Sequence, residues 1–135
     1  MKTDNNIRSY IKENEARFLD ELFSLIRIPS ISAEPAHKAD MLQCAERWRE
    51  LLIAAGVDHA EVMPSAGNPL VFAEKHVDDD APTVLVYGHY DVMPVDPLEL
   101  WLSVPFEPEV RDERIFASGA DDDKGQSFIQ LKAFE

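Results

Sequence analysis

A continuous run of apolar and β-branched residues at positions 83–87, with the sequence TVLVY, constrains the fold more than any other stretch of the chain. A strand with one face in solvent alternates apolar and polar side chains, whereas an unbroken run predicts a strand that is buried on both faces. Strands of this kind belong to sheets with helices on each side. We therefore predict an α/β fold, in which a three-layer sheet carries helices on both faces.

Two helices are predicted ahead of this strand. Apolar residues recur at three- and four-residue steps over residues 7–28, which indicates an amphipathic helix with Asp4 or Asn5 as its N-terminal cap. Pro29 ends this helix because its ring forces the preceding residue into an extended conformation. A second apolar stripe predicts another helix over about residues 37–55.

Shorter elements fill the remaining chain. Short strands are predicted at 59–63 and 70–74, a hairpin with arms at 106–110 and 114–117, and a last helix from about residue 124. That helix reaches Glu135 without a capping residue. We therefore expect the α/β domain to be incomplete at its C-terminus.

Composition narrows the classes of partner and location. The 135 residues carry 13 Lys and Arg against 26 Asp and Glu, a net charge of −13, of which −10 falls on residues 76–135. Nucleic acids and anionic membranes bind through basic patches, so we expect neither as a partner. The single cysteine, Cys44, excludes an intramolecular disulfide, and neither a secretion signal nor an apolar stretch of ~18 residues is present. We predict a cytoplasmic protein.

The first cluster of residues that could bind a metal or take part in catalysis directly follows the apolar run. His89 and Asp91 are two residues apart, so in an extended chain their side chains point to the same side. Ligands of open α/β sheets collect at such strand ends. The pair could share a metal ion, or one residue could orient the other that binds it. Taken alone, this spacing is more often a hydrogen-bonded pair at the end of a strand.

The second cluster, residues 118–125, has the sequence SGADDDKG. Three consecutive carboxylates at the start of a helix could simply complement the helix dipole. The glycines on both sides indicate a tight backbone path instead of a loose loop. The predicted hairpin just before this cluster could return the chain toward His89, which would bring the two clusters together.

The two clusters together resemble the zinc-dependent peptidase and deacylase family of carnosine-type dipeptidases, aminoacylases, succinyl-diaminopimelate desuccinylases and glutamate carboxypeptidases. The resemblance runs through residues 18–32, 86–96, 101–108 and 119–126, and it is greatest to the dipeptidase branch. It implies a zinc exopeptidase-like catalytic domain of which residues 1–135 form the N-terminal part. The rest of that domain and the family's lid or dimerisation domain are expected to be absent from this chain.

The resemblance also implies roles for individual residues. His89 would bind one zinc ion, Asp122 would bridge two, and Asp91 would be the catalytic carboxylate that orients the histidine. A cis peptide bond is implied between Asp122 and Asp123. Zn²⁺ is the implied metal, two per site in the complete enzyme, with Co²⁺ or Mn²⁺ as alternatives. The general base and the remaining ligands are expected downstream of Glu135.

The implied activity is metal-dependent hydrolysis of the amide bond of dipeptides or small peptides by the full-length protein, which is expected to form a homodimer. Two alternatives stay open: a deacylase that acts on N-acyl amino acids, and a catalytically incomplete fragment in the case of the isolated chain. Asp121, Ser118 and Met93 depart from the residues usual in the family. These departures leave the implied ligands intact and bear on substrate preference.

Overall fold

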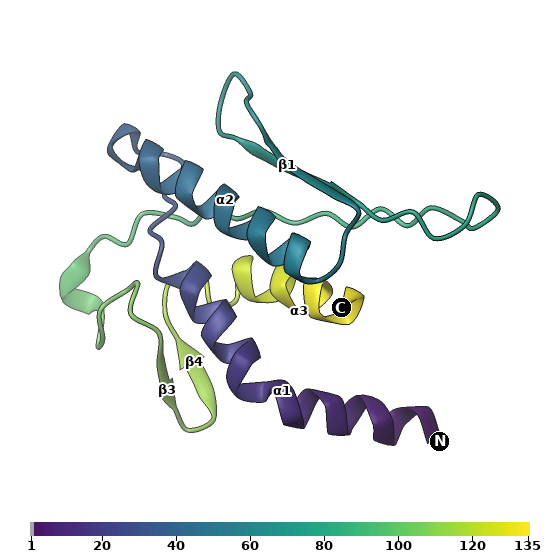
Figure 1. The fold of residues 1–135 in the computed structure, drawn as a ribbon. Helices are drawn as coiled ribbons and strands as arrows, with labels where there is room; N and C mark the ends of the chain where they lie inside the picture. Colours follow the sequence, from purple (N-terminus) through teal and green to yellow (C-terminus); the bar gives the residue numbers. More distant parts are fainter. Residues whose placement is uncertain (1) are drawn as a thin grey trace.

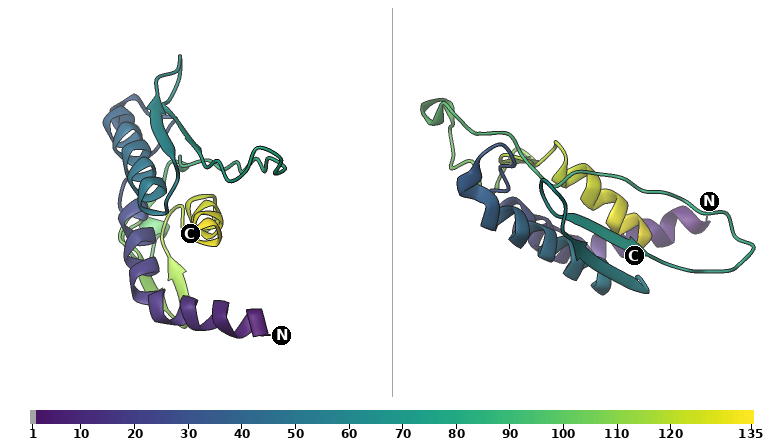
Figure 2. Two further views of the ribbon diagram at one scale, coloured as in Figure 1. Left: turned by 45° about the vertical axis from the view of Figure 1, so that its right-hand side comes forward. Right: turned by 90° about the horizontal axis from the view of Figure 1, so that it is seen from above.

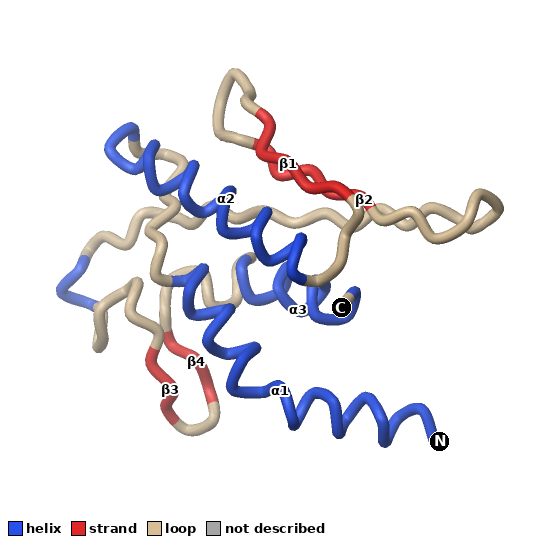
Figure 3. The backbone as a smooth tube through the Cα atoms, viewed as in Figure 1, coloured by secondary structure: helices blue, strands red, loops and turns tan. Residues whose placement is uncertain are grey.

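A computed structural model describes the backbone of residues 2–135 and the side chains of residues 5–135. Three helices and two short hairpins make up the structure (Figure 1; Figure 3). In chain order the elements are α1 (Lys2–Ile26), a 3-10 turn (Pro35–His37), α2 (Lys38–Ala54), β1 (His59–Met63), β2 (Leu70–Glu74), a second 3-10 turn (Leu98–Leu100), β3 (Glu109–Arg111), β4 (Arg114–Phe116) and α3 (Lys124–Phe134).

The three predicted helices are confirmed, with one difference at the start of the first. The α1 helix already begins at Lys2, because the polar residues before position 7 include neither proline nor glycine. Asp4 and Asn5 therefore lie within the helix, and the predicted cap is wrong. The helix ends at Ile26, three residues before Pro29. No described helix combines the length and the hydropathy needed to cross a membrane.

The core lies where the C-terminal half of α1, the inner face of α2 and one face of α3 meet (Figure 2). Burial of these apolar side chains provides the main force that holds the helices together. Leu25, Ile26 and Cys44 are completely buried. The buried set comprises Leu22, Leu25, Ile26, Ile28, Cys44, Trp48, Leu51, Phe128 and Leu131.

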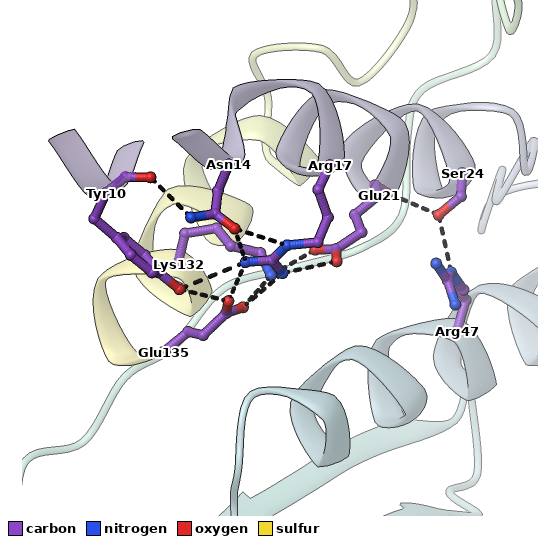
Figure 4. A network of polar contacts seen from close by, with 8 residues as sticks. All are labelled: Tyr10, Asn14, Arg17, Glu21, Ser24, Arg47, Lys132 and Glu135. Carbon is purple, nitrogen blue, oxygen red and sulfur yellow. Dashed lines mark hydrogen bonds and ion pairs between the residues drawn. The ribbon is translucent and has the colours of Figure 1, made fainter. Parts of the chain in front are cut away.

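A polar network joins the outer margins of α1 and α3 (Figure 4). The carboxylate of Glu135 accepts hydrogen bonds from the guanidinium of Arg17, from the hydroxyl of Tyr10 at 2.9 Å and from the ammonium of Lys132 at 2.6 Å. Lys132 also pairs with the carboxylate of Glu21 at 2.5 Å. The end of α3 is thereby tied to the middle of α1.

The predicted hairpin at 106–117 is confirmed, and the two strands predicted at 59–63 and 70–74 form a second hairpin. Strands β1 and β2 pair antiparallel, with Glu61 opposite Phe72, and this hairpin lies against α2. Strands β3 and β4 also pair antiparallel. Their turn places Asp112 and Glu113 at φ 49° and 60°, in the left-handed region that a tight reversal requires.

The run at 83–87 is not buried, and on this point the sequence-based prediction is wrong. The segment is extended, and the side chain of Leu85 is 91% exposed. A strand is buried on both faces only when it has neighbours in a sheet and helices above and below. Within residues 2–135 no strand pairs with this run, which follows a long arm that projects from the helices (Figure 1; Figure 2).

Candidate metal-binding site

The imidazole of His89 lies between two carboxylates. Its Nδ1 atom is 3.0 Å from Oδ1 of Asp91, and its Nε2 atom is 3.1 Å from Oδ1 of Asp122. The structure thus brings together the three residues that the sequence analysis selected, although Asp122 is 33 positions further along the chain. The chain returns from His89 to Asp122 through the β3–β4 hairpin.

Asp91 is held in place by the loop that follows α1. The hydroxyl of Ser32 donates a 2.5 Å hydrogen bond to Oδ2 of Asp91. Next to it, the Ser30 hydroxyl donates to the carbonyl of Tyr90 at 2.6 Å, and the amide of Val92 donates to the carbonyl of Ser30 at 2.9 Å. These bonds lay the two segments side by side and fix the direction in which Asp91 presents its second oxygen to His89.

The start of α3 is held against the same segment from the other side. Oδ2 of Asp123 accepts hydrogen bonds from the backbone amide of His89 at 2.9 Å and from the hydroxyl of Ser127 at 2.7 Å. The side chain of Ser127 packs so closely on Gly88 that a Cβ atom there would lie 2.0 Å from Oγ of Ser127. The implied cis peptide bond between Asp122 and Asp123 is confirmed.

These contacts change the protonation of the site. Burial disfavours the charged imidazole, but the hydrogen bonds to Asp91 and Asp122 and the negative charges of Asp91 and Asp123 outweigh it and raise the pKa of His89. Burial likewise opposes ionisation of Asp123, yet the bonds from Ser127 and His89 lower the pKa of its carboxyl. The side chain of Asp122 is 82% exposed, so its second oxygen is open to solvent.

Sequence reasoning missed two kinds of support for this site. Ser30 and Ser32 were part of a loop without an assigned role, although a small polar residue next to apolar ones often satisfies a neighbouring backbone group. Lys124 was assigned only to the start of the last helix. Its side chain is completely buried, and desolvation lowers its pKa, partly offset by the nearby Cys44 and Asp91. Because Lys124 directly follows three aspartates, the sequence around it indicated an exposed, charged segment and not a buried side chain.

The donor chemistry of this cluster fits part of a zinc site. Imidazole nitrogen and carboxylate oxygen are ligands that Zn²⁺ accepts, and a zinc-binding histidine typically gives its other nitrogen to a carboxylate, as His89 does to Asp91. Nε2 of His89 and the carboxylate of Asp122 are then the two groups that could coordinate a metal ion. Within the described residues, no three or more His, Cys, Asp or Glu side chains are grouped to hold a metal ion. The chain therefore presents a partial ligand set.

Known proteins similar to this chain include peptidases and a desuccinylase. Residues 85–135 match the family described as Peptidase family M20/M25/M40. A cysteinylglycine-S-conjugate dipeptidase from Corynebacterium striatum is 34% identical over 89% of this chain and 26% of its own length. A succinyl-diaminopimelate desuccinylase from Paraburkholderia xenovorans is 35% identical over 74% of the chain and 25% of its own. The chain spans about a quarter of the length of these relatives.

Similar solved structures also include a dipeptidase and a metallo-carboxypeptidase. Human carnosine dipeptidase 1 superposes on 96% of the chain with a TM-score of 0.87 at 24% identity, so this match shows the fold alone. An M20 family metallo-carboxypeptidase from Sulfolobus solfataricus covers 87% of the chain with a TM-score of 0.76 at 36% identity. The chain occupies 30% and 26% of those two structures. Both matches bear out the predicted α/β class.

Proposed function

Because the chain belongs to the peptidase family M20/M25/M40, we propose that it is part of a zinc-dependent hydrolase that cleaves the amide bond of dipeptides or small peptides. The observation that carries this proposal is the position of His89, between a carboxylate that orients it and a second carboxylate open to solvent. The dipeptidase and metallo-carboxypeptidase among the similar proteins support the reaction class.

Each residue of the cluster has a distinct task in this proposal. Asp91, held by Ser32, accepts a hydrogen bond from Nδ1 of His89 and so turns Nε2 toward Asp122. His89 and Asp122 would hold the metal, and Asp122 has a second oxygen free for a second ion. The bound metal would lower the pKa of a water molecule and polarise the scissile carbonyl.

We further propose that residues 1–135 form the N-terminal part of the catalytic domain. Two donors are fewer than the three or four that hold zinc in proteins, and the chain covers about a quarter of its relatives. The isolated chain is therefore expected to hydrolyse no dipeptide, even with added zinc. The homodimer and the cytoplasmic location predicted above belong to the same proposal, for the full-length protein.

A deacylase that acts on N-acyl amino acids is the second candidate, because a succinyl-diaminopimelate desuccinylase is among the similar proteins. Both reactions hydrolyse an amide bond and would use the same metal-binding residues. A panel of dipeptides and N-succinyl and N-acetyl amino acids, assayed on the full-length protein, separates the two candidates by their kcat/KM values.

The metal-binding step is testable on the 135-residue chain itself. Calorimetric titration with Zn²⁺ should show binding to the unchanged chain and a loss of about 10-fold or more in affinity for His89→Ala. His59→Ala is the matched control, since His59 lies on β1 and its nearest charged partner is Glu61, at 3.5 Å. Equal affinities for the two variants, or no binding by the unchanged chain, would contradict the proposed site.

A further inference from the structure

We propose that Lys124 is a positioning residue, which sets Asp122 relative to His89 by fastening the start of α3 to the end of α1. The inference rests on the metal-binding role proposed above for His89 and Asp122. Lys124 would not touch the metal or the substrate. It would act through the backbone that carries Asp122, two residues before it.

The side chain of Lys124 makes two long-range hydrogen bonds at the end of α1. Its ammonium donates to the carbonyl of Leu25 at 2.9 Å and to the carbonyl of Ile28 at 2.7 Å. Each carbonyl also accepts one backbone amide, from Ile28 and Ser30 respectively, so the lysine occupies the second lone pair of each oxygen. A cation is also the preferred partner of the negative end of a helix dipole.

The aliphatic part of Lys124 passes through a closely packed space. The backbone of Gly119 leaves room for no side chain there, since a Cβ atom would lie 2.7 Å from Cγ1 of Val92 and 3.4 Å from Cδ of Lys124. Lys124 itself is 0% exposed. The lysine side chain is therefore closely confined between Gly119 and the α1 carbonyls, which restricts the position of its Cα atom.

Asp122 depends on this anchor because its own side chain provides little restraint. That side chain is 82% exposed, so packing does not hold it, and the backbone determines whether its carboxylate reaches Nε2 of His89, 3.1 Å away. Lys124 fixes this backbone to the carbonyl of Ile28, and the same loop reaches Asp91 through Ser32. The end of α1 and the loop after it thus help to hold in place both Asp91 and Asp122, the two carboxylates that face His89.

The test compares Lys124→Met with Leu51→Ala in the 135-residue chain. Methionine keeps the buried volume and removes the donors, while Leu51 is a buried residue of α2 that shares the core and serves as a control for general destabilisation. Nuclear Overhauser contacts between the His89 ring and the β-protons of Asp122 are measured without metal, and Zn²⁺ affinity is measured by calorimetry. Lys124→Met should lose the contacts and about 10- to 100-fold in affinity, whereas Leu51→Ala should keep both.

The outcomes separate the two proposals. If Lys124→Met keeps both the ring contacts and the affinity of Leu51→Ala, the positioning role is overturned. If the unchanged chain binds no Zn²⁺, the proposed function fails, while the metal-free ring contacts still decide the role of Lys124.

A measurement on the unchanged chain covers the case in which Lys124→Met does not fold. Coupling between two sites is reciprocal, so Zn²⁺ binding should slow the exchange of the Lys124 ammonium protons with water. Exchange that is unaffected by saturating Zn²⁺ would overturn the inference.

Discussion

Two apolar regions of this chain have opposite fates. Leu25 on α1 is completely buried among the three helices, whereas Leu85 in the extended run is 91% exposed. Their side chains are identical, and both lie in segments rich in branched apolar residues. The two segments differ in their packing neighbours. The helices pack against one another within residues 2–135, whereas no strand in that range pairs with the run at 83–87. Hydrophobic sequence determines what can be buried, and neighbouring elements determine what is buried.

Leucine-to-alanine substitution in each region gives the largest expected contrast. Leu25→Ala should lower the free energy of unfolding by about 2–5 kcal/mol, because it leaves a cavity among packed side chains. Leu85→Ala deletes the same atoms, but there they are exposed to solvent, so the free energy of unfolding should change by less than about 0.5 kcal/mol. Urea denaturation followed by circular dichroism measures both. Similar losses for the two variants would refute the contrast between the regions.

A substitution of intermediate effect sharpens the description of the packed region. At Gly125, a Cβ atom would lie 2.0 Å from the carbonyl oxygen of Ala120, so Gly125→Ala forces the backbone apart and should cost about 1–3 kcal/mol. Gly67→Ala is the control, because a Cβ atom there lies an ordinary 3.9 Å from Ser65 Oγ. Thermal unfolding should show a lower midpoint for Gly125→Ala alone. A midpoint equal to that of Gly67→Ala would mean that the packing at α3 is looser than described.

The smallest effect is expected at the polar margin of α1 and α3. The hydrogen bond from Arg17 outweighs the effect of burial and, with the bonds from Lys132 and Tyr10, lowers the pKa of Glu135 from 4.5 to about 2. A lowered folded-state pKa stabilises the protein above the unfolded value, and this contribution is lost as the pH falls from about 4.5 toward 2. At neutral pH, Glu135→Gln should therefore cost up to about 1 kcal/mol.

The pH dependence supplies the measurement for this margin. The difference in unfolding free energy between the unchanged chain and Glu135→Gln should be present at pH 6 and should shrink steadily below about pH 4.5. A difference that stays constant down to about pH 2 would show that ionisation of Glu135 contributes nothing to the network in Figure 4.

The features that could be predicted from sequence are those with a local cause. The period of α2 and the bounds of strands β1 and β2 depend on residues close in the chain, and both were predicted within about two residues. The candidate trio of His89, Asp91 and Asp122 came from motif spacing and family resemblance. In contrast, the bonds from Lys124 to Leu25 and Ile28 span more than 90 residues, and no local pattern encodes them. The burial predicted for residues 83–87 failed for a similar reason, since it depends on strands that the described chain does not pair with it.

The double attachment of α3 has a consequence for motion. Its first residue is bonded to the end of α1 through Lys124, and Glu135, directly after its last turn, is bonded to Arg17 and Tyr10 near the middle of α1. We expect a helix of 11 residues that is bonded at both ends to resist pivoting and sliding along its neighbour. We therefore expect α1 and α3 to move together and to carry the His89 segment with them, because the backbone amide of His89 is bonded to Asp123 at the start of α3.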